Sequence, residues 1–149
     1  MKNRYKYIIL IVLIVATGLK LYSYYYPKAK IIVGNNMFTV LVANTPTRQY
    51  YGLSNRDDLG KYDGMLFKFN ESARYIFVMR QMNFALDFIW INQGKIVDLT
   101  YNAQPEPNTI EAKLTKYSPN NDVNWVLEAP AGFISKNGLK IGDNVSLLE

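Results

Sequence analysis

The chain opens with a short basic stretch and a long apolar run, and it then changes to short apolar segments separated by polar turns. Lys2, Arg4 and Lys6 precede the apolar residues 7–16. A basic region followed by an apolar region is typical of a secretory leader. The run has no polar face at helical spacing, which argues against a helix buried in a soluble core.

The length of the apolar run bears on whether it spans a bilayer. Residues 7–19 give about 20 Å of helix, whereas the core of a bilayer is about 30 Å thick. Continuing the helix to Tyr26 supplies the missing length and places Lys20 near the outer end, where its ammonium group can reach the interface. The predicted aromatic belt at that interface consists of Tyr22, Tyr24, Tyr25 and Tyr26.

We predict that residues 1–26 are a signal anchor or a signal peptide and that residues 7–26 contact the membrane. The small residues Ala16 and Gly18 offer only a weak processing site, which favours an uncleaved anchor. The basic flank is expected to stay on the cytoplasmic side. The rest of the chain is therefore expected outside the cytoplasm, anchored to the membrane or secreted if the leader is removed.

Beyond the leader, short apolar segments alternate with turn residues, and this pattern predicts strands. The turn Gly34-Asn35-Asn36 lies between two apolar segments and predicts a hairpin. Thr45 and Pro46 suit the start of a short helix, and Pro130 can open a second helix that ends near Gly138. The expected strands are residues 31–33, 38–43, 64–69, 75–82, 84–91, 95–100, 110–114, 123–129 and 145–148.

These elements predict the class of fold. Residues 84–91 are apolar on both faces, which predicts a fully buried strand, and residues 101–108 hold two prolines and predict an irregular loop. We expect a mainly β fold (β-rich α+β), in which a compact barrel- or sandwich-like domain with two short helices follows the N-terminal hydrophobic helix. Residues 27–36 are expected to form a linker and the first hairpin, and residues 37–149 the β-rich domain.

The formal net charge of +5 belongs to the leader and its flank. Six lysine and arginine residues and no acids precede residue 31, whereas the rest of the chain has eleven basic and twelve acidic residues. The part expected to fold therefore lacks the excess of positive charge that nucleic-acid binding requires, and we predict no nucleic-acid partner.

The chain has neither histidine nor cysteine. Their absence excludes a Ser-His-Asp triad, a cysteine nucleophile, a disulfide, and imidazole or thiolate ligands for a metal. Asp57, Asp58 and Asp63 do not have the spacing of a calcium-binding loop. We therefore predict no metal and no cofactor, and any chemistry must come from carboxylate, amine, guanidinium or hydroxyl groups.

Two acids within apolar segments, Asp87 and Glu128, are the candidate catalytic residues. A lone buried charge is costly, so Asp87 needs an arginine or several N–H donors, and the candidate arginines are Arg48, Arg56 and Arg80. Glu128 precedes an expected helix start, where it would cap the helix or face Asp87 across a site. A facing pair would suit glycoside hydrolysis or sugar binding.

Two motifs carry a family resemblance, Gly64-Met65-Leu66-Phe67-Lys68-Phe69 and Leu86-Asp87-Phe88-Ile89-Trp90-Ile91. Together with other short segments in a fixed order, they resemble the family called domain of unknown function 192, a group of uncharacterised prokaryotic proteins. The matching positions are 42–45, 48, 52–53, 56, 64–69, 77–82, 86–91, 94–97, 126–128, 132, 138 and 141–143. The resemblance covers about residues 37–148.

The chain departs from the family pattern at three positions. Val78 stands where the family usually has tryptophan, Gln81 where it has asparagine, and Ser54 where it often has methionine. If these segments line a pocket, the pocket of this chain has a different shape and its ligand can differ.

The resemblance implies a compact β-rich domain that is often exported, and it implies no established activity. Its motif positions in this chain are Arg48, Arg56, Met79, Asp87, Glu128 and Gly132. The polar positions lead us to predict a ligand-binding cleft that comprises Arg48, Arg56, Arg80, Asp87 and Glu128. We expect nearby guanidinium groups to keep both acids of this cleft ionised.

The favoured function is a membrane-tethered extracytoplasmic binding or accessory module for a polar ligand or an envelope component. One alternative is a hydrolase that acts on envelope glycan through Glu128 and Asp87, and the other is a structural interaction module. Carboxylate geometry discriminates among them, because an accessible pair about 5–10 Å apart favours hydrolysis. An Asp87 sealed against an arginine favours a structural role.

Overall fold

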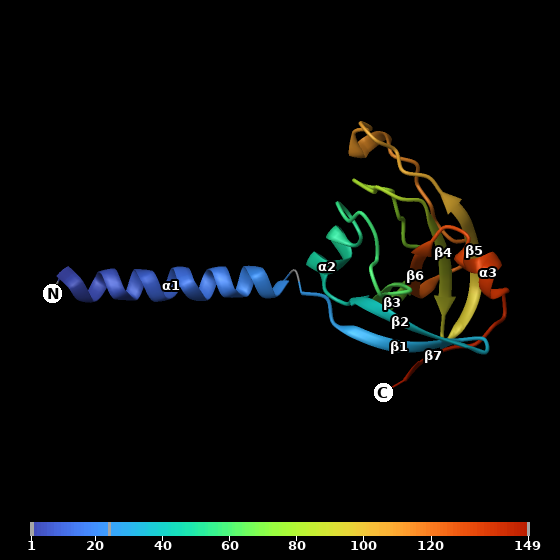
Figure 1. The fold of residues 1–149 in the computed structure, drawn as a ribbon, viewed down its shortest axis with the longest axis horizontal. Coiled ribbons are helices and arrows are strands. Elements are labelled where there is room, and N and C mark those ends of the chain that lie inside the picture. Colours follow the sequence, from blue (N-terminus) through green and yellow to red (C-terminus); the bar gives the residue numbers. More distant parts are fainter. Residues whose placement is uncertain (1, 24, 149) are drawn as a thin grey trace.

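The computed structural model describes residues 2–23 and 25–148, in which a long helix leads into a β-rich domain (Figure 1). Helix α1 (Lys2–Ser23) has 22 residues and extends away from the domain. Its stretch Arg4–Tyr22 is long and apolar enough to cross a membrane, and none of it is buried against the rest of the protein. The predicted N-terminal hydrophobic helix is therefore confirmed, although a signal sequence at this position would have the same properties.

The domain is built on one seven-stranded sheet with the strand order β5-β4-β6-β3-β2-β1-β7. The strands are β1 (Lys28–Val33), β2 (Asn36–Ala43), β3 (Gly64–Ala73), β4 (Leu86–Asn92), β5 (Lys95–Ala103), β6 (Val123–Pro130) and β7 (Val145–Leu148). Neighbouring strands are antiparallel except for the parallel pair β2–β3.

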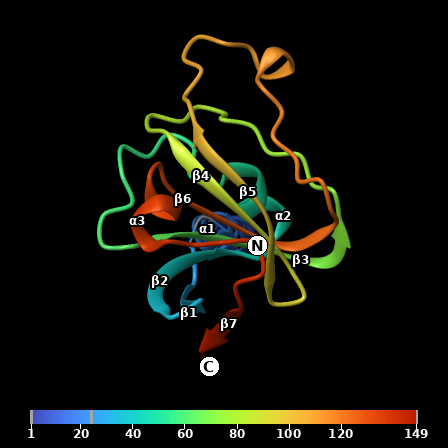
Figure 2. The ribbon, with the colours of Figure 1, turned by 90° about the vertical axis from the view of Figure 1, so that its right-hand side faces the viewer.

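The sheet is curled, as Figure 2 shows with α1 seen end-on behind it. At one end its two edges meet, because Lys95 at the start of β5 forms a bridge with Asn144 just before β7. The result is a half-barrel, which confirms the expected mainly β, barrel-like class without forming a closed barrel.

Two short helices accompany the sheet, as predicted. Helix α2 (Pro46–Tyr51) begins after the N-cap Thr45, whose side chain accepts a hydrogen bond from the backbone N–H of Arg48. Helix α3 (Phe133–Asn137) ends at Gly138 in a left-handed conformation, which glycine adopts without strain.

Three local expectations were wrong. Residues 75–82 form no strand, and their described pairing with another segment in strand fashion is an isolated bridge between Phe77 and Tyr117. Residues 110–114 contain the 3₁₀ helix η1 (Glu111–Lys113) instead of a strand, because their alternating apolar residues find no neighbouring strand with which to pair. Strand β5 continues to Ala103, so the irregular loop begins later than expected.

The junction between leader and domain also differs from the expectation. Residues 28–30 belong to β1 and not to a linker, because β1 begins at Lys28 and pairs with both β2 and β7, whereas the hairpin expected after them is confirmed. Tyr26 is only 8% exposed and donates a hydrogen bond to the backbone carbonyl of Arg48, so it belongs to the domain core and not to an interfacial belt. Tyr22 and Tyr25 are exposed, and Tyr24 lies outside the described residues.

The two faces of the sheet carry separate apolar clusters. The first cluster draws on all seven strands and on Ile134 of α3, so it fills the inside of the curl. The second cluster lies on the opposite face and includes Met65, Phe88 and Trp90, with Leu53 from the segment after α2. Because side chains alternate along a strand, neighbouring residues of β4 and β6 contribute to opposite clusters.

Candidate functional site

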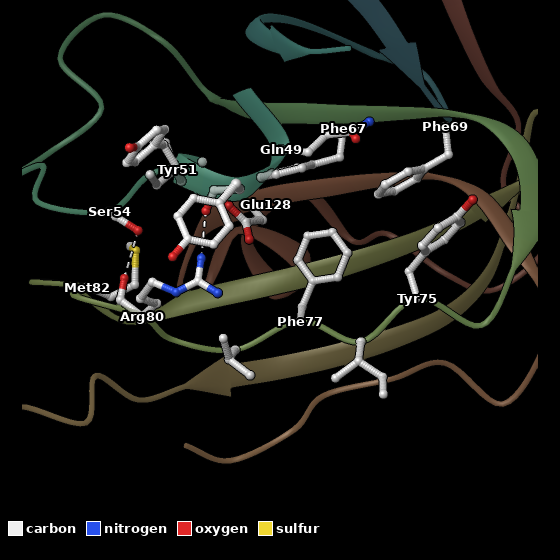
Figure 3. A pocket seen from close by; sticks show the side chains of 15 residues that line it. Gln49, Tyr51, Ser54, Phe67, Phe69, Tyr75, Phe77, Arg80, Met82 and Glu128 are labelled. Carbon is white, nitrogen blue, oxygen red and sulfur yellow. Dashed lines mark hydrogen bonds between the residues drawn. The ribbon is translucent and has the colours of Figure 1, made fainter. Parts of the chain in front are cut away.

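A cavity of about 160 Å³ lies on the face of the second cluster, between the sheet, α2 and residues 75–82. Figure 3 shows the side chains that surround it. The wall includes the rings of Phe67, Phe69, Tyr75 and Phe77, and among its charged residues are Arg80 and Glu128. The wall therefore combines aromatic rings with hydroxyl, guanidinium and carboxyl groups, a mixture that suits a small-molecule site.

Glu128 reaches this cavity because of the register of β6. It lies opposite Met65 of β3 on one side and Phe88 of β4 on the other, and both neighbours belong to the second apolar cluster. The Glu128 residue is 5% exposed, and its carboxyl group is directed toward the cavity (Figure 3). The described residues donate no hydrogen bond to this carboxyl group.

The surroundings of Glu128 disfavour its ionised form. Burial among apolar side chains removes the hydration of the carboxylate and raises its pKa to about 8. Glu128 is therefore largely protonated at neutral pH, and its carboxyl group offers both a donor and an acceptor to the cavity. The expectation that a nearby guanidinium group keeps Glu128 ionised is wrong.

Arg80 also lines the cavity, but its guanidinium group is bound to Tyr50 and Glu111. Its guanidinium group donates to the carbonyl oxygen of Tyr50 at 2.7 Å, forms an ion pair with Glu111, and lies 4.2 Å from the ring centroid of Tyr50. Its Nε is buried and has no hydrogen-bond partner among the described residues. Arg80 and Glu111 also line a second hollow of about 300 Å³ beside the first.

Asp87 lies on the other face of the sheet and does not take part in the cavity. It is opposite Ala129 in the register, one position away from the Phe88–Glu128 pair, so its side chain points to the inside of the curl. Its carboxylate accepts two backbone hydrogen bonds of 2.9 Å, from Asn102 and from Ile134. The expected arginine partner and the expected facing of Asp87 and Glu128 are both wrong, whereas the alternative of several N–H donors is confirmed.

The other two predicted arginines lie near Tyr26. The guanidinium group of Arg56 is 5.3 Å from the ring centroid of Tyr26, and that of Arg48 is 5.7 Å from the ring centroid of Tyr22. Arg48 is 6% exposed and donates to the side-chain oxygen of Asn44 at 2.8 Å. Burial raises the pKa of Tyr26, which lies within electrostatic range of both arginines and of Glu128. Neither arginine lines the cavity, so the predicted five-residue cleft is only partly assembled.

The aromatic wall is the part of the site that we did not predict. Phe67 packs edge-on against Phe77 with ring centroids 5.0 Å apart, and Phe69 stacks on Tyr75 at 3.7 Å. The sequence predicts a strand that includes Tyr75 and Phe77, whereas in the structure these residues pack over the sheet and line the cavity. Ser54 and Val78, two of the three departures from the family pattern, also line the cavity, as anticipated if those segments formed a pocket.

Fold and cavity together define a small β-rich domain with an acid-lined apolar pocket. The family model of domain of unknown function 192, described as an uncharacterized ACR, matches residues 29–147, and the chain belongs to this family. No curated protein matches the chain.

Two solved structures share the fold. A crystal structure from Sinorhizobium meliloti 1021, described as a candidate transcription regulator, has a TM-score of 0.73 and 26% sequence identity, and the match covers 82% of this chain and 95% of that one. A protein of unknown function from Novosphingobium aromaticivorans DSM 12444 has a TM-score of 0.71 and 27% identity over 80% of this chain and 84% of that one.

Proposed function

We propose that this protein is a membrane-tethered, extracytoplasmic binding module that holds a small ligand in the cavity beside Glu128. The observation that carries the proposal is a buried carboxyl group without a described hydrogen-bond partner in the wall of an aromatic cavity. Because the carboxyl oxygens are reached from the cavity, a ligand there can use the hydrogen-bonding capacity that the described residues leave free.

The geometry does not favour the hydrolase. A carboxylate pair must flank the scissile bond, and Asp87 is separated from Glu128 by the sheet itself and is held by two backbone N–H groups. The folded part also has a charge close to zero, so the description of one similar structure as a transcription regulator is not transferred to this chain.

Small aromatic compounds test the binding function directly. We expect benzyl alcohol to bind the full chain in detergent, measured by ligand-observed NMR, and we expect Val78→Trp to abolish this binding because the indole fills the cavity. Tyr101→Trp is the matched control, because Tyr101 is exposed and lies outside the cavity wall. Equal binding by wild type and Val78→Trp would contradict the assignment of the cavity as the binding site.

The membrane anchor is supported by the length of α1. Its 22 residues span about 33 Å at about 1.5 Å per residue, which matches a bilayer core. Since the natural chain has no cysteine, one introduced thiol reports its own location. We expect a membrane-impermeant maleimide to label Asn121→Cys in intact cells and to label Asn3→Cys only after lysis. Labelling of both positions only after lysis would refute the extracytoplasmic location.

A further inference from the structure

The cavity beside Glu128 holds features that point to the chemical class of its ligand, and this inference rests on the proposed binding function. Glu128 supplies an acidic group in a wall where the described residues offer it no hydrogen bond. A group that approaches Glu128 can bring an acceptor to its protonated form or a donor to its ionised form, and a positively charged donor gains most from the ionised carboxylate in low dielectric.

The aromatic wall provides a second, independent argument for a cation. Phe67, Phe69, Tyr75 and Phe77 all line the cavity. The face of an aromatic ring carries negative electrostatic potential and attracts organic cations within about 6 Å. Aromatic rings also contact the apolar part of a ligand, so one wall serves both halves of an amphipathic molecule.

Arg80 is the residue of the cavity wall that would oppose a cation. Its charge is offset by the ion pair with Glu111, and its guanidinium group is fixed by the carbonyl oxygen and the ring of Tyr50. Arg48 and Arg56 lie around Tyr26 and are not part of the cavity wall. Arg80 is therefore the positive charge in the cavity wall that a cation beside Glu128 would face, and the ion pair with Glu111 offsets it.

We propose that the cavity binds a small organic ammonium ion, with the ammonium group on the Glu128 carboxylate and an apolar body against the aromatic rings. The volume of about 160 Å³ matches this size, since a cavity of about 150 Å³ accepts benzene. Val78, in place of the family's usual tryptophan, leaves part of the wall open to the ligand.

Binding of an ammonium ion should change the number of protons bound to the protein, and this change can be measured. Before binding at pH 7 the Glu128 carboxyl group is largely protonated, because burial raises its pKa. When the ammonium ion binds, the carboxyl proton leaves to solvent and the ion pair forms. Each binding event should therefore release close to one proton, and the affinity should increase as the pH rises from 6 toward 8.

The test compares benzylammonium with benzyl alcohol on the full chain in detergent, by calorimetry in two buffers of different ionisation enthalpy. We expect benzylammonium to bind at least tenfold more tightly than the alcohol and to release close to one proton at pH 7. Glu128→Gln should lower the benzylammonium affinity at least tenfold and leave the alcohol unaffected. Asp122→Asn, at an exposed acid outside the cavity wall, is the matched control and should change neither.

The outcomes separate the two proposals. If the alcohol binds as tightly as benzylammonium, or if Glu128→Gln leaves the benzylammonium affinity unchanged, the ammonium inference is overturned while the binding function stands. Binding of benzylammonium without proton release overturns the role of Glu128 even if the variant fails to fold. If neither compound binds the wild-type chain, both proposals fail.

Discussion

Asp87 and Glu128 are both buried acids on adjacent strands, yet their surroundings are opposite. Asp87 is 1% exposed and its carboxylate accepts two backbone hydrogen bonds, whereas Glu128 is 5% exposed and receives none from the described residues. The first acid connects β5 and α3 to β4, and the second lines a cavity. The comparison shows that burial alone does not distinguish a structural acid from a candidate functional one, and that the supply of donors does.

The different surroundings of Asp87 and Glu128 result from a difference of one position in the register between β4 and β6. Asp87 lies opposite Ala129, and its neighbour Phe88 lies opposite Glu128. Side chains on consecutive positions of a strand point to opposite faces, so the two acids point away from each other although their strands are hydrogen-bonded. Four predictions test this contrast, in order of decreasing effect.

Asp87→Ala should produce the largest loss of stability. It removes two hydrogen bonds to a charged acceptor and leaves the N–H groups of Asn102 and Ile134 without a partner, at a cost of about 3–5 kcal/mol. Denaturant unfolding followed by the fluorescence of Trp90 and Trp125 measures the change. Asp122→Ala is the control at an exposed site. Equal unfolding midpoints for the two variants would refute the structural role of Asp87.

Glu128→Gln should increase the stability of the protein at alkaline pH, whereas Asp87→Ala lowers it. The pKa of Glu128 is about 8 in the native state and about 4.5 when unfolded, so the native state binds more protons between these values and the free energy of unfolding decreases as the pH rises through them. The variant has no carboxyl group at this position, so its free energy of unfolding does not decrease in this way. Its free energy of unfolding should exceed that of wild type by about 2–4 kcal/mol at pH 9 and by little near pH 4.5. The same unfolding assay at both pH values measures it. A parallel pH dependence of both proteins would show that Glu128 is not desolvated.

Gly64→Ala should disturb the Glu128 side of the sheet through the backbone. A Cβ atom at Gly64 would lie 2.5 Å from the carbonyl oxygen of Glu128 and 2.9 Å from Cδ1 of Leu127, so β3 and β6 must separate, at a cost of about 1–3 kcal/mol. Gly132→Ala, near Asp87, meets no atom within 4 Å and strains only the backbone, at about 1 kcal/mol. Thermal unfolding ranks the two variants, and a larger loss for Gly132→Ala would contradict the close approach at Gly64.

Glu111→Gln should have the smallest effect. The side chain of Glu111 is 54% exposed, and an exposed ion pair contributes less than about 1 kcal/mol. Arg80 keeps its hydrogen bond to Tyr50 and its contact with the ring, so the cavity wall should remain in place. A loss of more than about 2 kcal/mol in the unfolding assay would mean that Arg80 depends on this pair, and that its charge acts on the cavity when the partner is removed.

Elements with local signals could be predicted from the amino-acid pattern alone. The apolar run predicted α1, Thr45 and Pro46 predicted the start of α2, and the turn at residues 34–36 predicted the β1–β2 hairpin, because capping, turn chemistry and periodicity act over a few residues. Ordered motifs were sufficient to predict the family, and apolar flanks marked Asp87 and Glu128 as buried.

The surroundings of the two acids depend instead on how distant strands pair. The register between β4 and β6 placed them on opposite faces, and no local pattern fixes which residues of distant strands lie opposite each other. Tyr75 and Phe77 lie in a segment whose pattern predicts a strand, and they instead line the cavity, because the coverage of a sheet depends on contacts across the chain. The donors to Asp87 are the backbone N–H groups of Asn102 and Ile134, and since every residue except proline carries such a group, sequence cannot single them out.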